Sequence, residues 1–250
     1  MSEMTRYPIS QEDLDMVKTV TTPSEVIQQI PDGATVMIGG FGGSGAPIEL
    51  IHALIDHGAK HLTVVNNNAG NGHVGLAALI EQGRVDKLIC SFPRSADPSV
   101  FVAAYRANKI ALEIVPQGTL AERIRAGGAG IPAFYTPTAF GTEVAEGKPV
   151  EVFEGRSYIR ELWLKADYAL IKGDLSDTHG NITYRMAARN FNPIMATAAK
   201  VTIAQVSRVV QAGAIDPEHV VTPGIFINHL VEITHPAQEE ELNRAEAVYP

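Results

Sequence analysis

The chain has 250 residues, of which 45% are hydrophobic, and its formal net charge is −8. A chain of this length can bury about three quarters of its unfolded surface, which is enough for a substantial core. The negative charge and the scattered Lys and Arg residues argue against nucleic-acid binding. No apolar run approaches the ~20 residues of a membrane-spanning helix, and a single cysteine excludes an intrachain disulfide framework. Because the N-terminus also has no signal-peptide pattern, we expect a cytoplasmic protein with no nucleic-acid partner and no membrane partner.

The domain organisation is expected to be simple. Residues 1–20 are polar and mixed and form a predicted N-terminal extension, residues 21–235 a single predicted domain, and residues 236–250 a polar tail with helical character. At the start of the domain, Thr22 is placed to cap a short helix at Glu25–Gln29.

A glycine-rich segment follows the first predicted strand, Val36–Ile38. It holds five glycines in the seven residues 39–45, and Pro47 then opens a predicted helix at Ile48–His57. Glycines between a strand and a helix let backbone N–H groups approach a ligand closely. The segment therefore suits an anionic or carbonyl-bearing ligand.

The same segment matches the G-x-G-x-x-G pattern of dinucleotide-binding loops. That pattern needs an acidic residue about 20 residues further on to hold the ribose. Here the second predicted strand ends in Asn66-Asn67-Asn68, with neither the acid nor an Arg. A nicotinamide cofactor is therefore disfavoured, and a P-loop is excluded because no Lys-Ser/Thr pair follows the glycines.

Three further strand-then-helix units follow in chain order. The predicted strands are Leu62–Val65, Lys87–Cys90 and Ala111–Val115, and the predicted helices are Gly72–Gln82, Pro98–Asn108 and Leu120–Ala126, the last stopped by Gly127. Such alternation predicts an α/β fold with a parallel or mixed, doubly wound sheet and helices on both faces. Ligands of such sheets bind beyond the carboxyl ends of the strands, so the site is expected where the loops 39–45, 66–70, 91–97 and 116–119 meet.

The second half is predicted to be β-rich. The segment 127–141 is rich in Gly, Pro and aromatic residues and is interpreted as a long ordered loop. A hairpin at Glu151–Phe153 and Tyr158–Trp163 follows, and the further predicted strands are Tyr168–Ile171, Ile182–Tyr184, Val201–Val206 and Ile225–Val231.

The predicted strand-end loops contain hydrogen-bond donors but no nucleophile. Their amides and backbone N–H groups suit the polarisation of a carbonyl or thioester oxygen. Asp97, beside Pro98, is expected to cap the next helix, and Cys90 ends an apolar run, which favours a small buried hydrophobe over a reactive thiol. The eight histidines show no metal-binding spacing, so no metal site is expected, and no G-x-S-x-G elbow is present.

Several long motifs occur in a recognisable order. They are Asp32-Gly33-x-x-Val-Met-Ile-Gly39-Gly40-Phe41-x-x-x-Gly45-x-Pro47, Asn67-Asn68-Ala69-Gly70, Pro116-Gln117-Gly118-Thr119-Leu120-Ala121-Glu122-Arg123, Gly127-Gly128-Ala129-Gly130 and Ala188-Arg189-Asn190-Phe191-Asn192. Over about residues 22–232 the chain resembles the A-type subunit of the family I CoA-transferases. At 90–94 and 222–226 it is most similar to the members that transfer CoA from succinyl-CoA to 3-oxoadipate in aromatic catabolism, the beta-ketoadipate pathway.

The resemblance implies a Rossmann-like CoA-transferase fold and a ping-pong reaction in which the thioester is attacked by a glutamate of the partner B subunit. It implies no permanently bound cofactor, since the coenzyme A thioester is a substrate, and it implies an A2B2 heterotetramer that binds an acyl-CoA and an oxo acid. By motif, Asn67, Asn68 and Gln117 would hydrogen-bond the reacting groups, with Arg94 and Gly118 as candidate substrate contacts. The loop on the CoA side would be Gly39, Gly40, Phe41, Gly42, Gly43, Ser44 and Gly45.

Other functions stay open at this point. The same chemistry on acetoacetate is the alternative within the family. A metabolite-binding module without turnover would use the same glycine loop, and an NAD-dependent oxidoreductase is disfavoured by Asn66, Asn67 and Asn68 as argued above.

Overall fold

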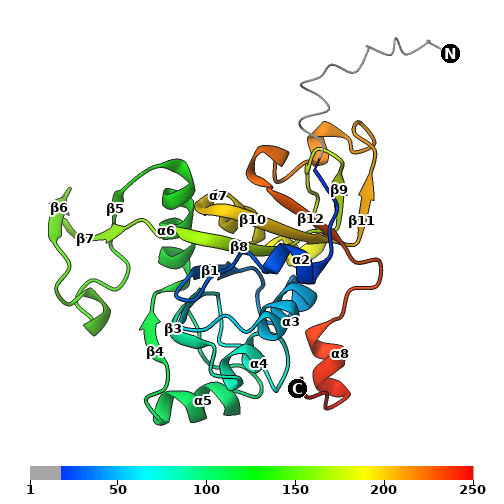
Figure 1. The fold of residues 1–250 in the computed structure, drawn as a ribbon. Helices are drawn as coiled ribbons and strands as arrows, with labels where there is room; N and C mark the ends of the chain where they lie inside the picture. Colours follow the sequence, from blue (N-terminus) through cyan, green and yellow to red (C-terminus); the bar gives the residue numbers. More distant parts are fainter. Residues whose placement is uncertain (1–17, 250) are drawn as a thin grey trace.

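The structure is a computed structural model that describes residues 18–249 (Figure 1). The predicted N-terminal extension lies outside these residues except for its last three positions. There, Lys18 N–H donates to the Thr178 carbonyl at 2.7 Å, and Val20 bridges to Leu230.

A sheet of seven strands forms the centre of the molecule, and every neighbouring pair in it is parallel. The strand order is β12-β10-β8-β1-β2-β3-β4. The chain thus leaves β1 toward one edge and later returns to its other side through β8. Such a reversal opens a crevice at the carboxyl end of the strands. The strands are β1 (Thr35–Ile38), β2 (Leu62–Val65), β3 (Val85–Cys90), β4 (Ala111–Ile114), β8 (Ala166–Lys172), β10 (Ala199–Val206) and β12 (His229–Glu232).

Helices cover both faces of this sheet, as the sequence predicts. Side chains alternate along a strand, so Val36 and Ile38 of β1 pack into one hydrophobic core while Met37 packs into the other. The first core is covered by α2 (Pro23–Ile27), α3 (Ile48–His57), α4 (Gly75–Glu81) and α5 (Ser99–Arg106), and the second by α6 (Gln117–Ala129) and α7 (Asn192–Ala198).

Smaller elements surround the sheet. The predicted hairpin is confirmed: β6 (Val150–Phe153) and β7 (Arg156–Leu162) pair antiparallel, and β5 (Ala133–Thr136) joins the other edge of β7. This three-stranded sheet projects from the body (Figure 1). The remaining elements are β9 (Leu175–Asp177) paired with β11 (Arg208–Val210), short 3₁₀ turns at Glu143–Ala145, Met186–Arg189, Pro217–His219 and Gly224–Phe226, and α8 (Glu239–Arg244).

The prediction that Gly127 stops a helix was wrong. Helix α6 continues through Gly127 and Gly128 and ends at Ala129, with Gly130 as its C-cap residue at φ +72°. The predicted loop 127–141 therefore begins with helix and also contains β5. A Cβ on Gly127 would overlap the Leu164 carbonyl, and one on Gly128 would overlap the Thr197 side chain of α7. These glycines are helical because tertiary packing requires a bare backbone there.

Two other predicted strands differ from the structure. Ile182–Tyr184 contains only isolated bridges at Ile182, and the segment 225–231 begins in a 3₁₀ turn, so β12 starts at His229. Helix α7 was not predicted. Ile182 and Ile227 are buried without belonging to a continuous strand ladder, whereas Ile225 is exposed, and the local sequence pattern does not reveal this difference.

We expect Gly127→Ala to destabilise the protein by about 2–4 kcal/mol, although alanine normally favours a helix by about 1 kcal/mol over glycine. The reason is the overlap with the Leu164 carbonyl. Gly118, in the same helix, has open space around its missing Cβ. Gly118→Ala should therefore be neutral or stabilising in urea unfolding. Equal behaviour of both variants would show that α6 does not pack as closely as described.

Candidate functional site

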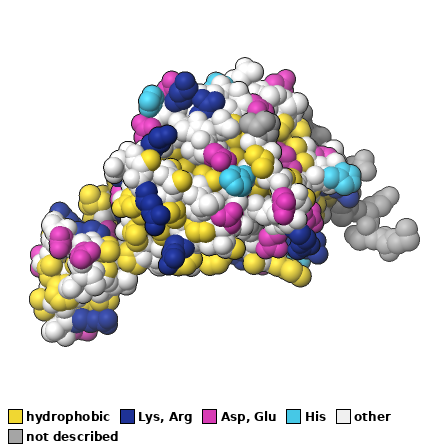
Figure 2. Space-filling view, turned by 90° about the horizontal axis from the view of Figure 1, so that it is seen from below, with side chains coloured by type: hydrophobic (Ala, Val, Ile, Leu, Met, Phe, Trp, Pro, Cys, Tyr) yellow, Lys and Arg dark blue, Asp and Glu magenta, His cyan; other side chains and the backbone are white. Residues whose placement is uncertain are grey.

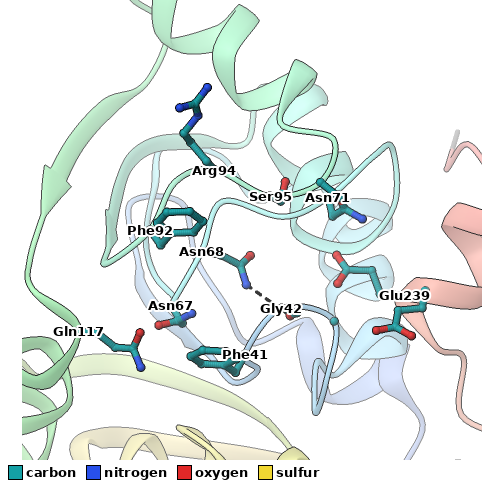
Figure 3. A pocket seen from close by; sticks show the side chains of 13 residues that line it. Phe41, Gly42, Asn67, Asn68, Asn71, Phe92, Arg94, Ser95, Gln117 and Glu239 are labelled. Atoms are coloured by element: carbon teal, nitrogen blue, oxygen red, sulfur yellow. Dashed lines mark hydrogen bonds between the residues drawn. The ribbon is translucent and has the colours of Figure 1, made fainter.

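Four strand-end loops meet around one cavity of about 460 Å³ at the carboxyl edge of the sheet (Figure 3). The loop after β1, the loop after β2, the loop after β3 and the start of α6 after β4 all contribute side chains. Helix α8, from the C-terminal tail, closes the remaining side. The residues that line the cavity include Phe41, Gly42, Gly43, Asn67, Asn68, Asn71, Phe92, Arg94, Gln117, Glu239 and Glu240.

The glycine loop is shaped by turn geometry and by packing. Phe41 and Ser44 exchange backbone hydrogen bonds of 3.0 and 3.2 Å, which closes a tight turn with Gly42 at φ +57°. Gly39 and Gly45 are buried against Asn192, whose side chain a Cβ on Gly39 would overlap. Among the predicted loop residues, only Phe41, Gly42 and Gly43 line the cavity.

Two side chains hold this loop from behind. The Asn192 Nδ2 donates to the Gly45 carbonyl at 3.1 Å, and the Asn190 Nδ2 donates to the Ser44 carbonyl at 2.9 Å. Asn192 also accepts the Lys172 N–H at 3.0 Å, which ties the loop to the end of β8. Both asparagines come from the 188–192 motif that the sequence singles out.

The three consecutive asparagines after β2 differ in their hydrogen-bond partners. Asn66 donates from Nδ2 to the Ile38 carbonyl at 2.7 Å and accepts the Asn68 N–H at 2.8 Å, so its amide is engaged inside the fold. Asn68 accepts the Gly70 N–H at 2.7 Å and donates to the Gly42 carbonyl at 3.3 Å. Asn68 therefore bridges two loops, and its side chain is partly engaged before any ligand arrives.

Asn67 and Gln117 have side-chain NH₂ groups that donate no hydrogen bond within residues 18–249. The Asn67 Oδ1 accepts from Ser91 Oγ at 2.7 Å, and its Nδ2 donates to nothing within residues 18–249. Gln117 is the exposed first residue of α6, and its side chain makes no hydrogen bond to the described part of the chain. Both amides face the cavity (Figure 3).

The other predicted site residues are less central. Arg94 lines the cavity, but it is exposed and its guanidinium extends away from Asn67 and Asn68 (Figure 3). Gly118 lies outside the cavity lining, one residue after Gln117.

Neither nucleophile candidate of the loops is reactive. Cys90 is fully buried, and burial raises the pKa of its thiol to about 12. Asp97 accepts the Ser99 N–H at 3.1 Å at the start of α5, and hydrogen bonding to Ser99 lowers its pKa. Asp97 thus accepts the first N–H of α5, as predicted for a cap, but it does so from the position before Pro98, which is the N-cap residue.

Sequence reasoning missed Glu239. Its side chain is only 6% exposed and lies against Gly43, where an added Cβ would sit 2.7 Å from Oε2. Burial raises the pKa of this carboxyl to about 7, against the lowering effect of a hydrogen bond with the Asn71 backbone, and nearby Glu240 raises it further. No salt bridge to Glu239 exists within residues 18–249.

Residues 18–249 bring together no group of three His, Cys, Asp or Glu side chains suited to a metal ion. None of the helices described is both long and apolar enough to span a bilayer.

Because the pKa of Glu239 is raised, the free energy of unfolding should depend on the ionisation of this residue. Its ordinary value of 4.5 applies to the unfolded chain, so ionisation costs folding energy progressively as the pH rises from about 4.5 to about 7. Each pKa unit corresponds to roughly 1.4 kcal/mol. Glu239→Gln should therefore stabilise the protein by about 1 kcal/mol or less at pH 5 and by about 3 kcal/mol at pH 8, measured by urea unfolding. Glu241→Gln, an exposed change on the same helix, is the control variant. A Glu239→Gln difference that does not change with pH would contradict the buried carboxyl.

Known proteins share this architecture. The sequence profile described as Coenzyme A transferase matches residues 20–233. The chain is 59% identical to the A subunit of the 3-oxoadipate CoA-transferase of Acinetobacter baylyi, over 86% of this chain and 95% of that protein. It is 46% identical to a Bacillus subtilis protein named as the A subunit of a probable succinyl-CoA:3-ketoacid coenzyme A transferase, over 86% and 90% of the two chains.

A solved structure shows the same fold. An acyl-CoA transferase of E. coli O157:H7 superposes with a TM-score of 0.78 at 21% identity, over 90% of this chain and 49% of that one. The profile match covers the sheet, the glycine loop and the asparagine motifs that shape the cavity. The chain is therefore a member of the Coenzyme A transferase family.

Proposed function

We propose that this chain is the A subunit of a CoA-transferase that moves CoA from succinyl-CoA to 3-oxoadipate, and that its nucleophile is a glutamate of a partner B subunit. One observation carries the proposal: the cavity presents unengaged amide donors from Asn67 and Gln117 but no activated nucleophile from the strand-end loops. The proposal is supported by the 59% identical relative, which is named as the A-type component of such an enzyme. Coenzyme A enters as a substrate, and no permanently bound cofactor is proposed.

The chain's own contribution is electrostatic. Amide donors near a thioester oxygen stabilise the negative charge that develops when a carboxylate attacks the carbonyl carbon. Gln117 is also the first residue of the 13-residue helix α6, whose N-terminus favours negative charge. In the proposed reaction the partner's carboxylate oxygen bonds to the acyl carbon, the C–S bond breaks, and the CoA thiolate leaves. The thiolate then attacks the glutamyl carbonyl of the anhydride, which releases succinate. The oxo acid then takes the same steps in reverse: its carboxylate attacks the glutamyl-CoA thioester and releases the thiolate, which attacks the new acyl group to form the product thioester and free the glutamate.

Glu239 is not the proposed nucleophile. It lies at the opposite end of the cavity from Gln117 (Figure 3), and it falls outside residues 20–233, which the family profile matches. A group that serves the shared chemistry of a family is expected within the matched region.

An exposed apolar surface supports an assembly. Figure 2 shows apolar side chains on the projecting lobe, interspersed with charged ones. The exposed apolar residues in and beside the three-stranded sheet include Tyr135, Val150, Val152, Phe153, Leu162 and Trp163. Large apolar patches mark protein interfaces more often than free surface. We infer that the chain works in a complex with its B subunit, for which an A2B2 heterotetramer is the proposed stoichiometry.

Acetoacetate is the second candidate acceptor. The Arg94 guanidinium extends away from Asn67 and Asn68. In this conformation it is not directed at the distal carboxylate of a 3-oxoadipate bound at these amides. The 46% identical relative is named for 3-ketoacids. Arg94 remains the candidate for that carboxylate because a rotated side chain can form two parallel hydrogen bonds with it.

We predict that this chain purified alone transfers no CoA from succinyl-CoA, and that co-expression with the B subunit encoded beside it restores transfer. Covalent catalysis needs an activated nucleophile, which the partner brings. The assay follows the formation of 3-oxoadipyl-CoA, with acetoacetate as the competing acceptor in a parallel reaction.

The outcomes separate the candidate functions. Faster transfer to 3-oxoadipate supports the proposed acceptor, and faster transfer to acetoacetate replaces it with the second. Binding of CoA without transfer in the complex would leave a metabolite-binding module. Turnover by the isolated chain, with no co-purified partner detected by mass spectrometry, would refute the two-subunit proposal.

We predict that Gln117→Ala in the complex lowers kcat by about 10²–10³ with little change in KM, which is typical for the loss of one oxyanion donor. Because the Gln117 side chain has no partner within the described residues, its loss should leave the thermal unfolding temperature unchanged. Asn68→Ala removes hydrogen bonds to two loops and should lower both kcat and the unfolding temperature. Unchanged kcat in Gln117→Ala would exclude this residue from the reaction.

A further inference from the structure

The Glu239 carboxyl has no role in the reaction proposed above, yet the fold holds it firmly in the substrate cavity. Its segment is anchored on both sides. Before it, the Ala237 N–H donates to Glu49 Oε1 at 2.6 Å, and after it the Tyr249 hydroxyl donates to Asp56 at 2.7 Å. The Tyr249 ring also stacks on His52 at 3.9 Å between centroids. The position of α8 is therefore built by several contacts and does not reflect a loose tail.

Among residues 18–249, no cation forms an ion pair with this carboxyl, although Arg94 lines the same cavity. The side chain is more than nine-tenths buried. The charged group that acts on it, Glu240, has the same sign. A buried carboxyl without a cation is costly, and such groups are concentrated at functional sites.

This setting selects the kind of ligand group that can sit there. A second carboxylate would be repelled by Glu239 and Glu240, whereas an uncharged N–H donor would satisfy the carboxyl oxygens without adding charge. The oxo acid offers only acceptor oxygens. The thiol-bearing arm of coenzyme A carries secondary amides, whose N–H groups are such donors.

The layout of the cavity fits that arm. Gln117 and Glu239 lie at opposite ends, with Phe41 and Gly42 between them (Figure 3). A thioester carbonyl held at the Gln117 end would leave the arm running past Phe41 and the bare Gly42 backbone toward Glu239. Gly43 has no side chain, which leaves the space that the Glu239 carboxyl fills.

We propose that Glu239 binds an amide N–H of the CoA arm and so makes the C-terminal helix a specificity element for the thioester substrate. This inference rests on the proposed CoA-transferase function. It assigns a binding role to a residue beyond the region that the family profile matches.

The test compares wild type, Glu239→Ala and Glu239→Gln, each in complex with the B subunit. In a ping-pong reaction kcat/KM reports each half-reaction separately. For succinyl-CoA we expect kcat/KM to fall at least ~10-fold in Glu239→Ala and less in Glu239→Gln, which keeps an acceptor oxygen. For the oxo acid kcat/KM should change little. In the second half-reaction the enzyme already carries CoA, so the arm is bound both in the starting enzyme and in the transition state.

A truncated donor separates binding from a structural effect. The succinyl thioester of a simple alkanethiol has no amide, so wild type and Glu239→Ala should use it equally well. Glu241→Gln, on the exposed side of α8, is the matched control and should behave as wild type with both donors.

Equal losses with the truncated donor, a loss confined to the oxo acid, or unchanged kinetics in Glu239→Ala would each overturn the inference. Those results leave the proposed function standing, because that function is tested by transfer in the wild-type complex. A wild-type complex that transfers no CoA would end both.

Discussion

The buried side chain of Asn192 is the contact on which the candidate site depends. Its Nδ2 donates to the Gly45 and Ala188 carbonyls, at 3.1 and 2.8 Å, while its Oδ1 accepts the Lys172 N–H at 3.0 Å. One amide therefore joins the glycine loop, the turn before α7 and the end of β8. A buried amide with all these partners is costly to misplace. This constraint also explains Gly39, since a side chain there would overlap Asn192.

In the proposed reaction the described residues of this chain supply hydrogen-bond donors, and the nucleophile comes from the partner subunit. Asn66 and Asn68 commit hydrogen bonds to the fold, which leaves the amides of Asn67 and Gln117 free to meet a developing charge. The Asn67 amide is held in place by its hydrogen bond with Ser91, whereas no hydrogen bond within residues 18–249 holds the Gln117 amide. The inert Cys90 thiol and the capping role of Asp97 leave the strand-end loops without an attacking group. The proposed partner glutamate completes this arrangement.

The sequence predicted the first half of the fold well because four strand-helix units there follow clear periodic patterns. The prediction failed at Gly127. Glycine usually ends a helix, but here α6 continues through it because the missing side chain allows close packing against the Leu164 carbonyl. The convergence of the loops was predictable because the carboxyl ends of parallel strands lie at one edge of a sheet. The difference between Asn67 and Asn68 was not predictable, since it depends on which amide the Gly42 carbonyl reaches. Glu239 could not be found because an acidic residue in a polar tail looks solvent-exposed until the fold places it over Gly43. In the structure the C-terminal tail lies beside Asn71 and Gly72, since Glu239 forms a hydrogen bond with the Asn71 backbone and Asn243 fills the space next to Gly72.

The central claim is that this chain supplies donors and its partner supplies the covalent nucleophile. The most direct measurement is to incubate the complex with succinyl-CoA, digest it, and locate the CoA-bearing peptide by mass spectrometry. The account predicts a CoA thioester on a glutamate of the partner chain, with none on any peptide of this chain. A CoA thioester on Glu239 or on any other residue of this chain would contradict it.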